Sequence, residues 1–91
     1  MRFSKIPHID EERLDGEIIL LHPRSLHVKV LNETAAALWD ALDAFSTAEE
    51  LVAIVSEARP EIPADEVRAL VGGFLDELVA ADLIEQVGHT N

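Results

Sequence analysis

The fold is decided in residues 26–42, LHVKVLNETAAALWDAL, where the hydrophobic pattern changes from the period of a strand to that of a helix. Up to Leu31 apolar and polar residues alternate, as in a half-buried strand. From Asn32 onward, which is a residue type that caps helix N-termini well, the apolar residues recur at helical spacing. We therefore predict a strand over residues 26–31 that passes directly into a helix ending near Ala44.

A second strand precedes this one. Residues 17–22, EIILLH, form a short aliphatic run that is typical of a buried strand. A turn at residues 23–25 joins the two strands, which we expect to pair as an antiparallel hairpin. Residues 5–13 form a weaker third strand, which Pro7 and the acidic run after it keep at a sheet edge or in a loop.

Two further helices follow in the pattern. Thr47 and Glu50 have capping-box spacing ahead of an apolar face, and this helix ends before Pro60. Pro63 and two acidic residues open the next helix, which stops near Asp82. Its apolar stripe follows the helical template at Val67, Leu70, Val71, Phe74, Leu75, Leu78 and Val79.

The alternation assigns two faces to the strand over residues 26–31. We expect Leu26, Val28 and Val30 to face the core, and His27 and Lys29 to face solvent. Three helices packed on one side of so small a sheet leave its other face or an edge uncovered. An uncovered edge can accept an extended peptide as an additional strand, although most edges are only blunted against pairing.

Length and composition are those of one small domain. With 91 residues, 48% of them hydrophobic and 27% charged, the chain is expected to form a single globular core over residues 1–91. Leu83 and Ile84 should fold back on this core, and Gly88 to Asn91 should be frayed. The lack of cysteine, of a signal peptide and of a long apolar run predicts a cytoplasmic protein with no disulfide and no membrane span.

The charge is distributed unevenly. Residues 1–31 hold five basic and five acidic side chains, whereas residues 32–91 hold two basic and thirteen acidic ones. Residues 32–91, which include the predicted helices, therefore carry the whole formal charge of −11. Nucleic acids bind proteins through Lys and Arg on phosphates, so we expect no nucleic-acid partner.

No pattern of catalytic or metal-binding residues is present in the sequence. His8, His22 and His27 match no known spacing of metal ligands, and we expect them to be solvated near the predicted turn. The serines lack the context of an activated nucleophile, and neighbouring carboxylates lie on predicted solvated helix faces. We therefore expect that the protein is not an enzyme and carries no cofactor or metal ion.

Gly72 and Gly73 lie inside the last predicted helix, where each costs about 1 kcal/mol relative to alanine. Such a cost is offset if another part of the chain, or a bound peptide, passes close to the helix. Close internal packing is the favoured interpretation of the two. Trp39 is expected in the core.

Residues 30–43, VLNETAAALWDALD, end the predicted strand and open the first helix with the most specific pattern of the chain. With residues 47–51, TAEEL, and the later apolar positions, they make the chain resemble the PqqD family over about residues 14–87. The later positions are Val71, Phe74, Leu75, Leu78, Leu83 and Ile84.

The resemblance implies a fold and a function. The fold is α+β and winged-helix-like, with an N-terminal antiparallel two- to three-stranded sheet followed by three helices. Members of the family are peptide chaperones, or precursor-peptide recognition elements. They bind the leader segment of a ribosomally synthesised peptide and present it to a modifying enzyme, often a radical SAM protein.

The resemblance also implies where the leader binds. In the family, the leader adds as a strand and lies in a groove bordered by the third helix, which here begins at Pro63. The chain departs from the family pattern at Ala44-Phe45 and at Asp82, where glycine is common in the family. The first departure leaves the conformation of the turn before Thr47 undetermined. The second is mild, because Asp tolerates a left-handed backbone conformation. The implied peptide-binding residues are Leu26, His27, Val28, Lys29, Val30, Leu31, Arg68, Val71, Leu75 and Val79.

An alternative from another class stays open. The domain could be a winged-helix regulator or a dimerisation module, in which the same strand edge pairs with a second copy of the chain to give a homodimer. The acidic helices argue against a DNA-binding version of this alternative.

Overall fold

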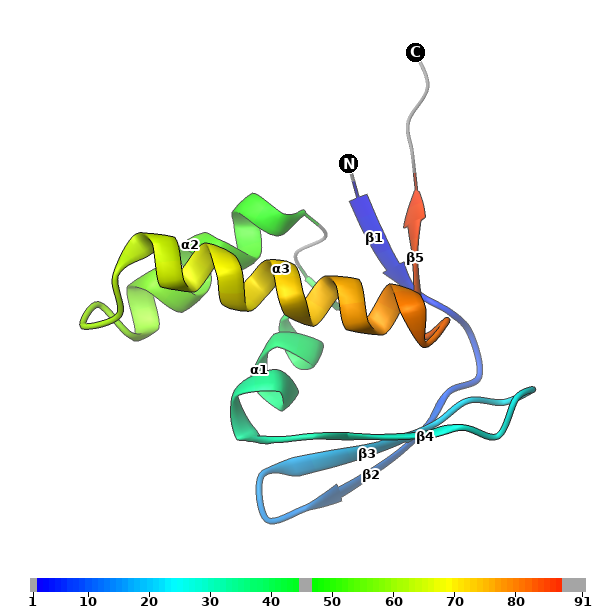
Figure 1. The fold of residues 1–91 in the computed structure, drawn as a ribbon. Helices are drawn as coiled ribbons and strands as arrows, with labels where there is room; N and C mark the ends of the chain where they lie inside the picture. Colours follow the sequence, from blue (N-terminus) through cyan, green and yellow to red (C-terminus); the bar gives the residue numbers. More distant parts are fainter. Residues whose placement is uncertain (1, 45–46, 88–91) are drawn as a thin grey trace.

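Two antiparallel sheets and three helices make up the computed structural model, which describes residues 2–44 and 47–87 (Figure 1). The expected α+β order, an N-terminal sheet followed by helices, is confirmed. The expectations for Phe45 and for Gly88 to Asn91 lie outside the described residues. The elements are β1 (Arg2–Lys5), β2 (Asp10–Leu14), β3 (Glu17–Leu21), β4 (Val28–Leu31), α1 (Glu33–Ala41), α2 (Ala48–Ala58), α3 (Ala64–Ala80) and β5 (Ile84–Val87).

The larger sheet has the strand order β2-β3-β4, so the predicted hairpin of β3 and β4 is confirmed and β2 is an edge strand. The smaller sheet pairs β1 with β5 and joins the two ends of the described chain, with Lys5 opposite Ile84. The sequence predicted that Leu83 and Ile84 return to the core, and both are buried. It did not predict β5, because a four-residue strand whose partner lies at the other end of the chain leaves no local pattern.

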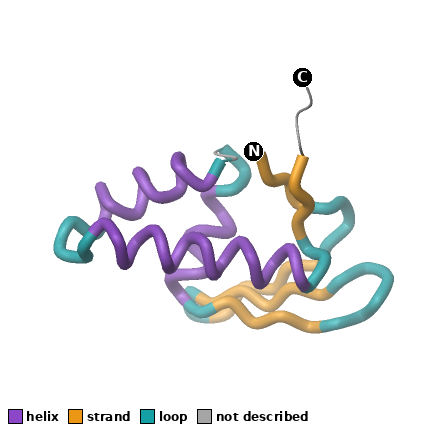
Figure 2. Tube along the Cα trace, turned by 45° about the horizontal axis from the view of Figure 1, so that its top comes forward, coloured by secondary structure: helices purple, strands orange, loops and turns teal. Residues whose placement is uncertain are grey.

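The helices cover one face of the larger sheet (Figure 2). Ile18 and Leu20 of β3 are buried on this face. The register places Leu31 opposite Ile18 and Lys29 opposite Leu20. Because directly opposed residues share a face, Leu31 and Lys29 also point toward the helices.

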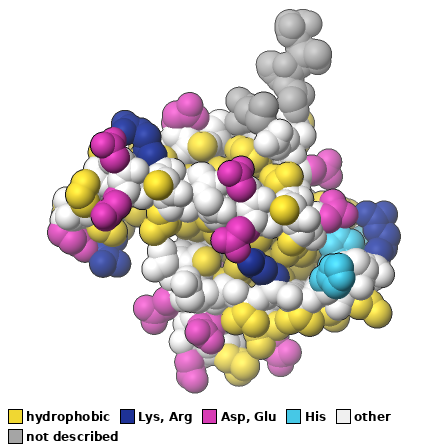
Figure 3. Space-filling view, in the orientation of Figure 1, with side chains coloured by type: hydrophobic (Ala, Val, Ile, Leu, Met, Phe, Trp, Pro, Cys, Tyr) yellow, Lys and Arg dark blue, Asp and Glu magenta, His cyan; other side chains and the backbone are white. Residues whose placement is uncertain are grey.

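The prediction that Leu26, Val28 and Val30 face the core was wrong. Val28 is 61% exposed and Val30 57% exposed, whereas Leu31 is 2% exposed. A shift of one residue reverses every side chain of a strand, and the burial of Leu31 under the helices sets the phase here. Leu26 precedes the strand, with a φ of 62° and an exposed side chain. Figure 3 shows apolar side chains along this outer part of the sheet, at the bottom of the view.

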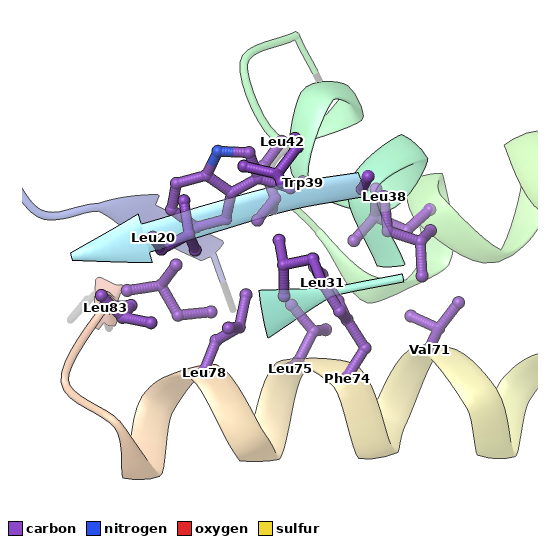
Figure 4. Packing of buried hydrophobic residues seen from close by; sticks show 14 of the residues in the cluster. Leu20, Leu31, Leu38, Trp39, Leu42, Val71, Phe74, Leu75, Leu78 and Leu83 are labelled. Carbon is purple, nitrogen blue, oxygen red and sulfur yellow. The ribbon is translucent and has the colours of Figure 1, made fainter. Parts of the chain in front are cut away.

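The core lies between the sheet and α3. Trp39 is fully buried, as expected, and belongs to the same buried cluster as Leu31 of β4 and Leu78 of α3 (Figure 4). The Lys5 ammonium lies 4.2 Å from the centre of the Trp39 ring. The α3 stripe is confirmed at its buried positions Val67, Val71, Phe74, Leu75 and Leu78.

The helix starts follow the sequence closely. The Asn32 side chain accepts a hydrogen bond from the Ala35 amide at 2.9 Å. Thr47 and Glu50 form the predicted capping box, in which each side chain accepts from the backbone of the other. In residues 2–44 and 47–87, no helix is both long enough and apolar enough to span a membrane.

Candidate functional site

The edge of β4 that faces away from β3 is open. Within the described chain β4 pairs with β3 alone, and β1 pairs with β5 instead of covering this edge. The His22 amide donates to the His27 carbonyl at 3.0 Å, which marks these two residues as a hydrogen-bonded pair. Because such pairs alternate along an antiparallel ladder, the N–H and C=O groups of Val28 and Val30 point to the open edge.

A groove of about 400 Å³ runs beside this edge, between β4 and α3. Lys29, Val30 and Leu31 form its strand side, and the start of α1 closes one end. An extended segment lying in it would have free backbone groups on one side and a helix surface on the other. The α3 side is lined by Ala69, Leu70, Gly73, Phe74, Glu77 and Leu78.

The α3 wall combines apolar surface with one charge. Leu70 is 37% exposed, although it belongs to the apolar stripe of the helix, and Phe74 lies one turn further along. Glu77 forms an ion pair with Lys29 of β4, which links the two walls across the groove. Since both side chains are partly exposed, the pair stabilises the fold only slightly and can exchange partners at little cost.

Gly73 lines the groove, and Gly72 lines a second hollow between α2 and α3. The interpretation that close internal packing explains the two glycines was wrong. Apart from its chain neighbours and the nearby backbone of its own helix, a Cβ atom added at either position would meet no described atom within 4 Å. The fold itself therefore does not require glycine at these positions.

The β4 part of the expected site lies together. Lys29, Val30 and Leu31 line the groove, and Val28 lies on the open edge. Leu26 and the exposed His27 belong to the turn before β4, although the sequence placed them in the strand.

The structure places the four α3 residues away from this groove. Val71 and Leu75 are buried in the core, and Val79 is half-buried against it. Arg68 is exposed and borders the hollow between α2 and α3. The groove is lined instead by the opposite flank of α3.

Sequence reasoning missed Leu70, Gly73 and Glu77 as groove residues. They recur at a spacing of three and four, so they share one flank of α3. A helical wheel alone does not say which flank faces the sheet. The sequence did hold one signal for the groove flank, namely Gly73. A glycine inside a helix lowers helix stability, and no internal contact of Gly73 offsets that loss.

The charged groups near the sheet are structural. Arg13 of β2 donates two hydrogen bonds to Asp40 of α1, at 3.0 and 2.7 Å. These bonds hold the pKa of Asp40 below its usual value. Among the described residues, no cluster of three or more His, Asp or Glu side chains could hold a metal ion.

Comparisons with known proteins complete the description of the site. A family model described as Coenzyme PQQ synthesis protein D (PqqD) matches residues 17–84, which run from the start of β3 to the start of β5. The comparison with curated proteins gave no match. A solved structure, "TbiB1 in Complex with the TbiA(beta) Leader Peptide", has a chain with 21% identity and a TM-score of 0.82. The match covers 94% of this chain and 99% of that one, and it shows that the two share a fold.

Proposed function

Because the chain belongs to the PqqD family, we propose that it binds the leader segment of a ribosomally synthesised precursor peptide and presents it to a modifying enzyme, such as a radical SAM protein. In this proposal the protein makes and breaks no covalent bond. The observation that carries the proposal is the open edge of β4 beside the groove. The solved TbiB1 structure is of that protein in complex with a leader peptide, which supports the same role for this fold.

Binding occurs by strand addition. The leader pairs with the outward N–H and C=O groups of Val28 and Val30, and these hydrogen bonds set its register. Alternate side chains of an extended peptide point to opposite sides, so every second one enters the groove. There they pack on Leu70 and Phe74 over the space that Gly73 leaves open.

The modifying enzyme then meets a leader of fixed register. Strand addition leaves the alternate leader side chains that face away from the groove exposed. The chain beyond the groove stays free to reach a separate active site.

The proposal is tested by removing one outward amide. In Val30→Pro the strand keeps its hydrogen bonds to β3, because the lost N–H points to the open edge, where proline is tolerated in sheets. The control Val30→Thr keeps the amide and the β-branched shape. The probe is a peptide selected against the wild-type protein from a randomised display library.

We expect the peptide to shift the amide resonances of β4 and of the groove flank of α3 together. Val30→Pro should weaken binding by about tenfold, the effect of losing one hydrogen bond, while Val30→Thr binds like the wild type. Unchanged binding by a folded Val30→Pro variant would rule out strand addition at this edge. Light scattering on the same samples shows whether a second copy occupies the edge instead.

A further inference from the structure

His22 is buried at the end of β3, with 2% of its surface exposed, so the expectation that it is solvated was wrong. It follows Leu20 on the helix-facing side of the sheet by the alternation of the strand. The proposed function gives this residue no role. A buried polar side chain needs partners, and those of His22 lie in two different parts of the chain.

The first set of partners is the turn before β4. The Nδ1 atom of His22 accepts hydrogen bonds from the backbone amides of Arg24 and Ser25, both at 3.0 Å. In the same turn the Leu26 amide donates to the His22 carbonyl at 3.1 Å, and Leu26 has a φ of 62°. Since two N–H groups point at Nδ1, that atom carries no proton, and neutral His22 must carry its proton on Nε2.

The second partner is the end of α3. The Nε2 atom of His22 lies 3.3 Å from the Asp82 carboxylate, a contact that is not a hydrogen bond in the described structure. Asp82 has a φ of 61° and occupies the left-handed position after the helix, where glycine is usual. The Leu83 amide donates to the Leu78 carbonyl and completes this helix end.

We propose that His22 is a positioning residue for peptide binding, which fixes where β4 begins and, through Asp82, ties β4 to the end of α3. The turn and the end of α3 lie close together in both Figure 1 and Figure 2. β4 and α3 are the two walls of the groove, so the link sets their separation at the end beyond the Lys29–Glu77 pair. This inference rests on the proposed function for its effect on binding, but its geometry is a property of the free protein.

The first test uses the free protein alone. Long-range ¹⁵N–¹H correlation spectra of the imidazole should show the His22 proton on Nε2 and none on Nδ1. In His22→Ala the amides of Arg24 and Ser25 should exchange with solvent faster than in the wild type. His22→Asn should restore slow exchange at Arg24, because an Asn oxygen accepts from the amide two residues on. A proton on Nδ1, or unchanged exchange in His22→Ala, would overturn the proposal whether or not a peptide binds.

The second test separates positioning from stability. Asp82→Gly removes the carboxylate but suits the positive φ, so its unfolding midpoint should equal or exceed that of the wild type. It should nevertheless bind the library-selected peptide about tenfold more weakly. Asp82→Asn keeps an oxygen facing Nε2 and should recover most of the affinity. If Asp82→Gly binds like the wild type, the link to α3 has no role in positioning.

Discussion

Gly73 offers a direct measure of whether the groove is a binding site. Apart from its chain neighbours and the nearby backbone of α3, an added Cβ at Gly72 or Gly73 meets no described atom within 4 Å, so neither alanine variant should suffer a clash. Replacing a helix-interior glycine by alanine should therefore raise the free energy of unfolding by about 1 kcal/mol in each case. For a domain of this size that corresponds to a rise in Tm of about 4–8 °C.

Substitutions at Gly72 and Gly73 should differ in their effect on peptide affinity. Gly73 lies in the groove beside β4, whereas Gly72 faces the hollow between α2 and α3. Gly73→Leu places a side chain where the leader's own apolar side chain would pack. The peptide then loses the burial of about one large apolar group, about 1.5–3 kcal/mol, which is about a tenfold to hundredfold loss of affinity. Gly72→Ala should bind like the wild type.

Thermal unfolding and isothermal titration calorimetry with the library-selected peptide measure both effects. The reasoning is refuted if folded Gly73→Leu keeps the wild-type Kd, because the space over Gly73 would then be empty in the complex. A fall in Tm for both alanine variants would refute the account of the open space itself.

Three further predictions concern stability and charge. The pKa of Asp40 is lowered in the folded state, so its pair with Arg13 contributes fully above the unfolded value of 3.8 and is lost as the pH falls through the folded pKa. Because these side chains are 47% and 55% exposed, Asp40→Asn should cost only about 0.5 kcal/mol in urea unfolding at neutral pH, and this cost should shrink as the pH falls below 3.8. Leu78→Ala empties a fully buried site between α3 and the sheet and should lower the free energy of unfolding by about 2–5 kcal/mol, whereas a loss below about 1 kcal/mol would contradict its place in the core. Because the helices are acidic, a basic peptide should associate faster at low salt than at high salt in stopped-flow measurements, and a rate independent of salt would exclude this steering.

The sequence predicted the elements better than their orientation. The capping residues Asn32 and Thr47 and the α3 stripe act over a few neighbouring positions, so local pattern located the helices. The prediction of which β4 side chains face the core was wrong, because Val28, Val30 and Leu31 are all apolar. Only the burial of Leu31 under the helices determines which side of the strand faces inward.

The sequence likewise predicted only one of the two walls of the groove. The β4 wall follows from chain order, since β4 is the last strand of its sheet. The α3 wall depends on how the helix rotates over the sheet, which the packing of Val71 and Leu75 into the core decides. The burial of His22 was likewise missed, because its contact with Asp82 joins positions far apart in the chain and no local pattern signals it.

An open strand edge that can pair with a peptide can also pair with other copies of the same chain, and the exposed apolar side chains of Val28 and Val30 favour such self-association. The formal charge of −11 acts as the safeguard, because every approaching copy carries the same sign. The acidic side chains of the helices thus oppose self-association at the β4 edge, although they do not lie on that edge. High salt screens this repulsion and acid removes it by protonating the carboxylates. The protein should therefore aggregate first under these two conditions.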